Sequence, residues 1–194
     1  MKEVLLSEKQ IEDICERIGK EISEALKNEE RIPILVGVMK GSLNFMITLM
    51  KYITVPFYTD YIQISSYYGT TRTNHVRLLK DLSYDCTDRT IIIIEDIVDT
   101  GHSMDFLVEH IKRHDAKKVL VCTLIDKKNA REVPVQIDFT GYVLEKNRFL
   151  IGFGLDYFEL ERNLPYIYEA DEDDVARLDK VINEEFKLTD GNGE

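Results

Sequence analysis

The most informative stretch of this 194-residue chain is Ile91-Ile92-Ile93-Ile94-Glu95-Asp96-Ile97-Val98-Asp99-Thr100-Gly101-His102-Ser103-Met104. Its run of isoleucines predicts a strand buried in the centre of a sheet. Leu107, Val108 and Ile111 then share one side of a helix that we expect over residues 103–114. The acidic and hydroxyl residues between strand and helix therefore lie at the carboxyl end of a central strand, where open α/β sheets bind ligands.

This turn offers binding groups of two opposite kinds. The carboxylates of Glu95, Asp96 and Asp99 accept hydrogen bonds from hydroxyls or attract a cation, whereas residues 99–103 offer backbone N–H groups and a helix N-terminus to an anion. A phosphorylated sugar bound with Mg²⁺ satisfies both requirements. The alternative is an ordinary strand-turn-helix connection whose acidic residues are solvated. The sequence contains no GxxxxGK[ST] phosphate loop.

Strand and helix patterns alternate along the rest of the chain. Helical spacing predicts helices over residues 7–28 and 43–52, with Ser7 and Ser42 as their N-caps. Aliphatic or alternating segments predict further strands at residues 33–39, 55–64, 76–82, 119–125, 141–144 and 149–153. This alternation predicts an α/β fold with a mostly parallel sheet. Residues 65–75 are polar, show no core pattern and are a candidate mobile loop.

Composition excludes several classes of protein. The chain has 36 acidic and 25 basic residues and a formal net charge of −11, which argues against nucleic acid or an anionic membrane as partner. Residues 91–94 are the longest aliphatic run, far below the ~20 residues of a membrane span. Cys15, Cys86 and Cys122 form no CxxC pair, so we expect a reducing, cytoplasmic location. His110 and His114 are four residues apart, and we interpret them as part of a solvated helix face rather than as metal ligands.

The order hydrophobic strand, Glu95-Asp96, two aliphatic residues, then Asp99-Thr100-Gly101-His102-Ser103 resembles the signature of the type I phosphoribosyltransferases, which bind 5-phosphoribosyl 1-pyrophosphate. The resemblance implies the fold of that family: a mostly parallel central sheet flanked by helices, a small hood and a flexible catalytic loop. It also implies roles for these residues. Glu95 and Asp96 would hold the ribose hydroxyls and Mg²⁺, the turn at Thr100, Gly101, His102 and Ser103 would bind the phosphate, and Asp99 would be the general base.

Two further segments resemble the hypoxanthine-guanine phosphoribosyltransferases. The segment Val38-Met39-Lys40-Gly41-Ser42 is similar to their pyrophosphate loop, which implies a cis peptide between Met39 and Lys40 that directs backbone N–H groups of Met39, Lys40 and Gly41 at the diphosphate. The segment Ser65-Ser66-Tyr67 is similar to the start of their catalytic lid, and implies that Ser66 and Tyr67 contact the same substrate. Because Tyr68 doubles the aromatic residue, which tyrosine covers the site stays open. Arg162 matches a position that contacts pyrophosphate.

The base-binding positions of the same family also have counterparts. Lys127 matches the lysine directed at the 6-oxygen of the purine, a donor that favours a 6-oxopurine over adenine. By resemblance, Phe149 would stack on the base, the Leu150 backbone would meet its edge, and Asp156 would help hold Mg²⁺ and the base. For Phe149 the alternative is a core aromatic residue in a strand.

The resemblance implies an enzyme of purine salvage that transfers the phosphoribosyl group to hypoxanthine and guanine, forms a nucleoside monophosphate and releases pyrophosphate. It also implies a homodimer or homotetramer. A regulator built on the same fold and a xanthine- or adenine-preferring relative are the alternatives. The relative use of hypoxanthine, guanine and xanthine is not determined by the sequence.

The chain divides by charge at its C-terminal end. Residues 169–194 carry a net charge of −7, and residues 1–168 the remaining −4. Apolar residues recur at helical spacing in this acidic segment, so we expect a docked amphipathic helix that ends in disorder from Asp190. We therefore expect a phosphoribosyltransferase domain over residues 1–168 and a separate acidic extension over residues 169–194.

Overall fold

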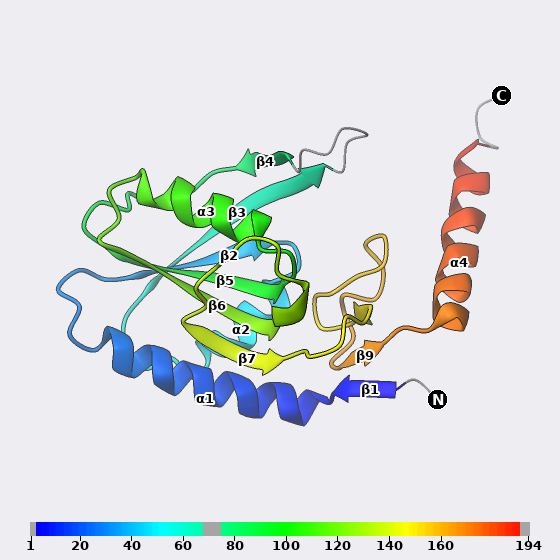
Figure 1. Ribbon diagram of the computed structural model, residues 1–194, viewed down its shortest axis with the longest axis horizontal. Coiled ribbons are helices and arrows are strands. Elements are labelled where there is room, and N and C mark those ends of the chain that lie inside the picture. Colours follow the sequence, from blue (N-terminus) through cyan, green and yellow to red (C-terminus); the bar gives the residue numbers. More distant parts are fainter. Residues whose placement is uncertain (1–2, 68–74, 191–194) are drawn as a thin grey trace.

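The computed structural model describes residues 3–67 and 75–190, and is built around a six-stranded sheet in the order β4-β3-β2-β5-β6-β7 (Figure 1). Neighbouring strands are parallel except β4, which is antiparallel to β3. The predicted mostly parallel α/β sheet is thus confirmed. Its strands are β2 (Ile34–Met39), β3 (Tyr58–Tyr67), β4 (His75–Lys80), β5 (Thr90–Val98), β6 (Lys118–Asp126) and β7 (Phe139–Val143).

Strand β5 lies in the middle of the sheet, and helices cover both of its faces. Its side chains at Ile92 and Ile94 pack in one core cluster with residues of α1 (Glu8–Leu26) and α2 (Leu43–Met50). Ile91 and Ile93 point to the other face and pack with residues of α3 (His102–Lys112). All four isoleucines are fully buried, which explains why the strand reads as an unbroken apolar run.

The two predicted N-caps have different outcomes. At α1 the capping box is confirmed, since Ser7 Oγ accepts from the Gln10 backbone N–H at 3.4 Å and Gln10 Oε1 accepts from the Ser7 N–H at 2.9 Å. Ser42 is the N-cap residue of α2, as predicted, but its side chain makes no capping hydrogen bond. The reason is its backbone, which is already helical at φ −69° and ψ −8°, whereas a capping residue is extended.

A second, three-stranded antiparallel sheet has the order β1-β9-β8, with β1 at Glu3–Leu6, β8 at Leu150–Ile151 and β9 at Ile167–Glu169. The strand predicted over residues 149–153 was expected to join the parallel sheet, and this expectation is wrong. Gly152 and Gly154 have φ values of +105° and +103°, so the extended chain stops after Ile151. The small sheet forms a hood beyond the carboxyl ends of the main strands (Figure 1).

The first residues of the predicted mobile loop form part of a strand instead. Residues 65–67 belong to β3, where they pair with β4 in an antiparallel hairpin. The pattern of side chains predicts a strand that ends at residue 64, which is three residues too short. Polar residues suit a hairpin as well as a loop, so the pattern does not mark the true end of the strand. Residues 68–74, including Tyr68, lie outside the described residues, as do the side chains of Ser66 and Tyr67.

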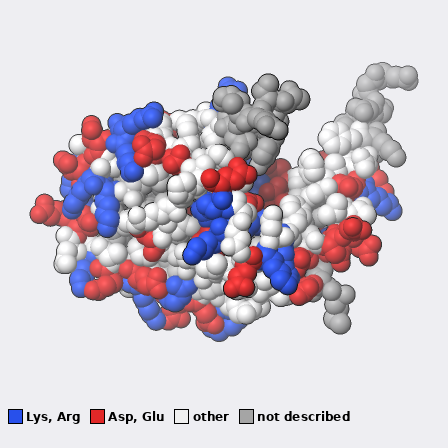
Figure 2. All heavy atoms as spheres, in the orientation of Figure 1, with Lys and Arg blue, Asp and Glu red and all other residues white. Residues whose placement is uncertain are grey.

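The acidic C-terminal segment forms helix α4 (Glu172–Asp190), which projects from the body beside the hood (Figure 1). Leu178 is buried against Ile151 and Tyr168, and Asp179 Oδ1 accepts from the Tyr157 hydroxyl at 2.7 Å. Val181, one turn further, is 47% exposed, whereas Leu178 is buried, so the observed core packing of α4 involves its first half. Acidic side chains gather over its first turn (Figure 2). The predicted disordered end after Asp190 lies outside the described residues.

No helix within the described residues is both long enough and apolar enough to cross a membrane.

Candidate active site

A cavity of about 270 Å³ opens at the carboxyl ends of β2 and β5. Seven of the residues predicted from the sequence line it: Met39, Glu95, Asp96, Asp99, Thr100, Gly101 and Ser103. A larger hollow of about 620 Å³ lies between α3 and the start of β6 and contains none of the predicted residues. The cavity at the strand ends is therefore the candidate active site, as expected from the sheet topology.

Two neighbouring carboxyls line this cavity, that of Asp96, which is buried, and that of Glu95, which is partly buried. Asp96 is 7% exposed, and its Oδ1 accepts from the Ile97 backbone N–H at 2.9 Å. Burial raises the pKa of Glu95 well above its ordinary value, and the charge of Asp96 raises it further. Burial also raises the pKa of Asp96. Two carboxyls that resist ionisation here would ionise more readily beside a cation, and their hard oxygen donors suit Mg²⁺.

The pyrophosphate loop lies directly against this acidic pair. The expected cis peptide between Met39 and Lys40 is present. A Cβ atom added to Gly41 would lie 2.0 Å from Asp96 Oδ2, and one added to Gly154 would lie 2.0 Å from the Gly41 carbonyl oxygen. Glycine is therefore required at both positions because backbone, carboxylate and hood loop are in direct contact.

The phosphate turn connects β5 to α3 through Gly101, whose φ is +96°. The Thr100 carbonyl accepts from the backbone N–H groups of Glu132 and Val133, at 2.9 and 3.0 Å. These hydrogen bonds hold the turn against the segment that contains Glu132 and Val133. His102 does not direct its imidazole into the cavity, since its Nε2 lies 2.9 Å from Glu132 Oε2. The predicted role of His102 in phosphate binding therefore depends on its backbone N–H at the helix N-terminus.

Lys127 is joined to the predicted general base. Its Nζ lies 3.0 Å from Asp99 Oδ2 and 3.3 Å from Asn147 Oδ1. Lys127 is only 8% exposed, whereas the Asp99 side chain is 48% exposed. The backbone N–H of Lys127 donates to the Val98 carbonyl at 3.0 Å, so adjacent strands position both side chains.

Glu159 of the hood loop contacts both Arg162 and Lys40, the latter in the pyrophosphate loop. The guanidinium NH2 of Arg162 lies 2.9 Å from Asp156 Oδ1, and the Arg162 Nε lies 3.3 Å from Glu159 Oε2. Lys40 Nζ lies 3.0 Å from the same Glu159 oxygen. Hydrogen bonds from Lys40 and Arg162 lower the pKa of Glu159, so this carboxylate holds two cations that the sequence assigned to pyrophosphate.

Two side chains of the predicted base site differ sharply in exposure. Phe149 is 46% exposed, and its ring meets the edge of the Tyr157 ring with centroids 5.9 Å apart. It is therefore not the core aromatic residue considered as the alternative. Leu150 is 5% exposed in β8, so its side chain is not available to a ligand.

Sequence reasoning missed Glu159 and Asn147, which contact the predicted lysines. Neither residue lies in a strand, and neither belongs to a motif. Glu159 has a φ of +71°, a conformation that no local pattern of its sequence indicated. Their positions follow from loop packing, which brings together residues that are 20 and 119 positions apart in the sequence.

Comparison with known proteins agrees with this geometry. Residues 2–157 match the sequence profile described as the phosphoribosyl transferase domain. The hypoxanthine-guanine phosphoribosyltransferase of Streptococcus mutans is 40% identical over 174 residues, which cover 89% of this chain and 95% of the relative. The crystal structure of a hypoxanthine phosphoribosyltransferase from Staphylococcus aureus has a TM-score of 0.83 at 34% identity and covers 89% of this chain and 93% of its own.

One group of relatives is much longer than this chain. The bifunctional protein TilS/HprT of Listeria innocua is 40% identical over 168 residues, which are 86% of this chain but 26% of the relative. The chain thus spans about a quarter of the length of these bifunctional proteins.

Proposed function

Because the chain belongs to the hypoxanthine-guanine phosphoribosyltransferase family, we propose that it transfers the 5-phosphoribosyl group from 5-phosphoribosyl 1-pyrophosphate to hypoxanthine and guanine. The products are IMP or GMP and pyrophosphate. This is the chemistry of purine salvage. The single observation that carries the proposal is the 3.0 Å contact between Lys127 Nζ and Asp99 Oδ2. It places the lysine that we assign to the purine beside the carboxylate that we assign as general base.

The Lys127–Asp99 pair supports a specific order of events at the base. The 6-oxygen of an incoming oxopurine accepts a hydrogen bond from the Lys127 ammonium and so competes with Asp99 for it. Asp99 Oδ2 is then free to accept the imidazole N–H of the purine, which makes that nitrogen a better nucleophile toward C1 of the ribose. Adenine places an amino donor opposite the ammonium and gains no such bond.

The pyrophosphate end of the substrate competes in the same way for Lys40 and Arg162. Both cations lie within 3.3 Å of Glu159 Oε2, and a polyanion would exchange with that carboxylate for them. Backbone N–H groups of the Met39–Gly41 loop and the N-terminus of α3 would bind the diphosphate and the 5′-phosphate. These groups stabilise the negative charge that develops on the leaving pyrophosphate.

Glu95 and Asp96 would orient the ribose hydroxyls so that C1 faces the purine. The same two carboxyls, with Asp156, would hold Mg²⁺. The ion, when bound, supplies charge neutralisation at the pyrophosphate. Asp156 already contacts Arg162 at 2.9 Å, so the Glu95–Asp96 pair is the part of this set that fits a cation best.

An assay of pyrophosphate release with hypoxanthine, guanine, xanthine and adenine in turn tests the proposal. Release with hypoxanthine and guanine, and little with adenine, is the expected result. Preference for xanthine would reassign the substrate, and no release with any purine would contradict the enzyme itself.

The proposal also covers the oligomeric state, the location, the domain organisation and the partners of the enzyme. The enzyme is a homodimer or homotetramer that acts in the cytoplasm, and its location is supported by three buried cysteines that form no disulfide. It consists of a catalytic domain over residues 1–168 and an acidic extension over residues 169–194. It takes 6-oxopurine and 5-phosphoribosyl 1-pyrophosphate as its small-molecule partners, with neither nucleic acid nor membrane.

A further inference from the structure

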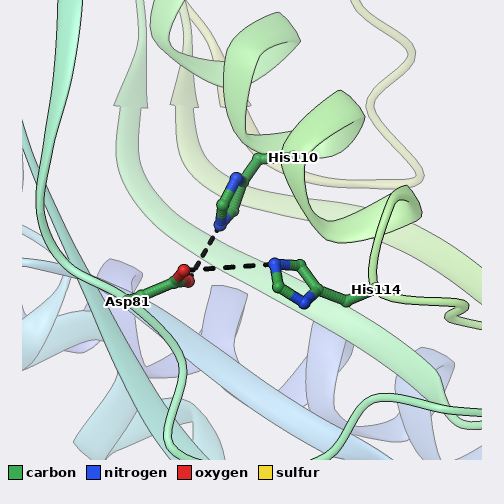
Figure 3. A group of neighbouring side chains, drawn as sticks. All are labelled: Asp81, His110 and His114. Atoms are coloured by element: carbon green, nitrogen blue, oxygen red, sulfur yellow. Dashed lines mark hydrogen bonds and ion pairs between the residues drawn. The ribbon is translucent and has the colours of Figure 1, made fainter.

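Asp81, His110 and His114 form a cluster outside the candidate active site (Figure 3). Asp81 follows directly after β4, His110 lies in the last turn of α3, and His114 lies two residues beyond the end of that helix. His110 is eight residues along α3 from His102, which corresponds to about 12 Å at 1.5 Å per residue. The cluster is therefore separated from the phosphate turn by most of the length of α3.

The donor atoms of the three side chains converge on a common point. His110 Nε2 lies 2.8 Å from Asp81 Oδ1, and His114 Nε2 lies 4.0 Å from Asp81 Oδ2. One donor atom from each residue lies within 4.8 Å of the other two. Nitrogen and oxygen ligands around tetrahedral zinc are about 3.3–3.5 Å apart, given bonds of about 2.0–2.2 Å. The observed distances lie on either side of this value, so small side-chain movements suffice to admit a metal ion.

Neighbouring groups hold the ligands in this arrangement. The His110 ring stacks on the Phe106 ring at 9° with centroids 6.0 Å apart, and meets the His114 ring edge-on with centroids 4.9 Å apart. The Leu82 backbone N–H donates to Asp81 Oδ1 at 2.7 Å. The C-terminal end of α3 also contributes a partial negative charge, which favours a cation there.

We propose that Asp81, His110 and His114 bind a transition metal ion of the zinc class, with water in the fourth position. Two imidazoles and one carboxylate are a donor set typical of zinc and unsuited to Mg²⁺, which prefers oxygen ligands. The histidine side chains are 19% and 48% exposed and that of Asp81 is 42% exposed, so an ion and its water can enter from solvent. This site is distinct from the acidic pair at Glu95 and Asp96.

Metal binding here would fasten the end of the β3–β4 hairpin to the end of α3. The opposite end of that hairpin bears residues 68–74, and the opposite end of α3 begins at the phosphate turn. A metal ion would therefore stabilise the folded chain and tie together the two elements that flank the candidate active site.

Zinc binding by the full chain, measured by calorimetry in excess Mg²⁺, tests the proposal. The Mg²⁺ occupies the carboxylate site, so one zinc ion per chain is expected. Saturating zinc should raise the melting temperature, by roughly 5–10 °C at a hundredfold excess over Kd. Cobalt substituted for zinc should give the visible absorption of a four-coordinate site with nitrogen and oxygen ligands.

Variants locate the bound ion. His114→Gln and His110→Gln should each weaken zinc binding roughly tenfold or more, since loss of even an indirect partner costs that much. His102→Gln is the matched control, because His102 lies on the same helix but outside the cluster, and it should leave zinc affinity unchanged. His114 is 48% exposed, so its replacement leaves the core intact. Absence of zinc binding, or binding that neither cluster variant weakens, would overturn the proposal.

Discussion

Replacement of Lys127 by Met removes the ammonium group that we assign to the purine 6-oxygen, while it keeps an unbranched side chain of similar length. Lys127 is 8% exposed, so its charge is already largely out of water before a purine arrives. Its partner Asp99 has a side chain that is 48% exposed and can be hydrated when Lys127 is lost. The variant should therefore fold, and its defect should lie in substrate binding.

The magnitude follows from the bond that is lost. A hydrogen bond from a charged donor contributes about 1.5–3 kcal/mol, which corresponds to about a 10- to 100-fold change in affinity. We expect KM for hypoxanthine and for guanine to rise by this factor. KM for 5-phosphoribosyl 1-pyrophosphate should stay the same, because we assign its diphosphate end to Lys40 and Arg162.

Initial rates of nucleotide formation, with each substrate varied while the other is saturating, measure both constants. Lys128→Met is the matched control, since Lys128 is the next residue, carries the same charge and is exposed in the short helix Lys128–Ala130. An unchanged KM for hypoxanthine in Lys127→Met would refute the assignment. So would an equal rise in the Lys128→Met control, which would indicate a general effect of charge.

The remaining predictions concern the base, the acidic pair, the pyrophosphate loop and the tail. Asp99→Asn should lower turnover by roughly 10²-fold while binding of 5-phosphoribosyl 1-pyrophosphate is retained, and single-turnover rates with unchanged chemistry would exclude Asp99 as the base. Burial raises the pKa of Glu95, so the folded state loses stability as the pH rises from the pKa in the unfolded chain, near 4.5, through the higher pKa in the folded chain. Glu95→Gln should therefore have a higher melting temperature than the parent at pH 8, and the difference should shrink toward pH 5. A difference that does not change with pH would contradict this linkage. Gly41→Ala places a Cβ 2.0 Å from Asp96 Oδ2 and should weaken 5-phosphoribosyl 1-pyrophosphate binding roughly tenfold or more, measured by calorimetry against the same substrate, with equal affinity the contrary result. Removal of residues 171–194 should lower the number of subunits, measured as the light-scattering mass divided by the mass of the truncated chain, because we expect α4 to contribute to the subunit interface; an unchanged number of subunits would exclude that role.

The central strand illustrates what could be predicted from local sequence. An unbroken run of isoleucines is stable only where both faces of a strand are covered, and the structure buries Ile91–Ile94 fully between two layers of helices. The acidic residues and the glycine turn follow this strand in sequence, so their position at its carboxyl end was also predictable. Residues 149–153 were assigned to the wrong sheet because a short apolar segment carries no information about which strand it pairs with.

The candidate site divides in the same way. Glu95, Asp96, Asp99 and the phosphate turn are neighbours in sequence, and chain connectivity alone brings them together. The contacts of Lys127 with Asn147 and of Lys40 with Glu159 join residues 20 and 119 positions apart. Local sequence does not encode such contacts; that of Lys40 with Glu159 depends on the path of the hood loop, which turns at Gly152 and Gly154.

His110 and His114 also show that local sequence does not reveal contacts with distant residues. The four-residue spacing correctly indicates that His110 and His114 are near one another, but it predicts a solvated helix face and gives no sign of Asp81. Asp81 joins them from a different element, 29 residues from His110. Functional groups that are neighbours in sequence were determined by the sequence alone, because adjacent residues share one strand or turn. The members of each ion pair and of each proposed ligand cluster were decided by tertiary packing, because only the fold sets which distant side chains come within bonding distance.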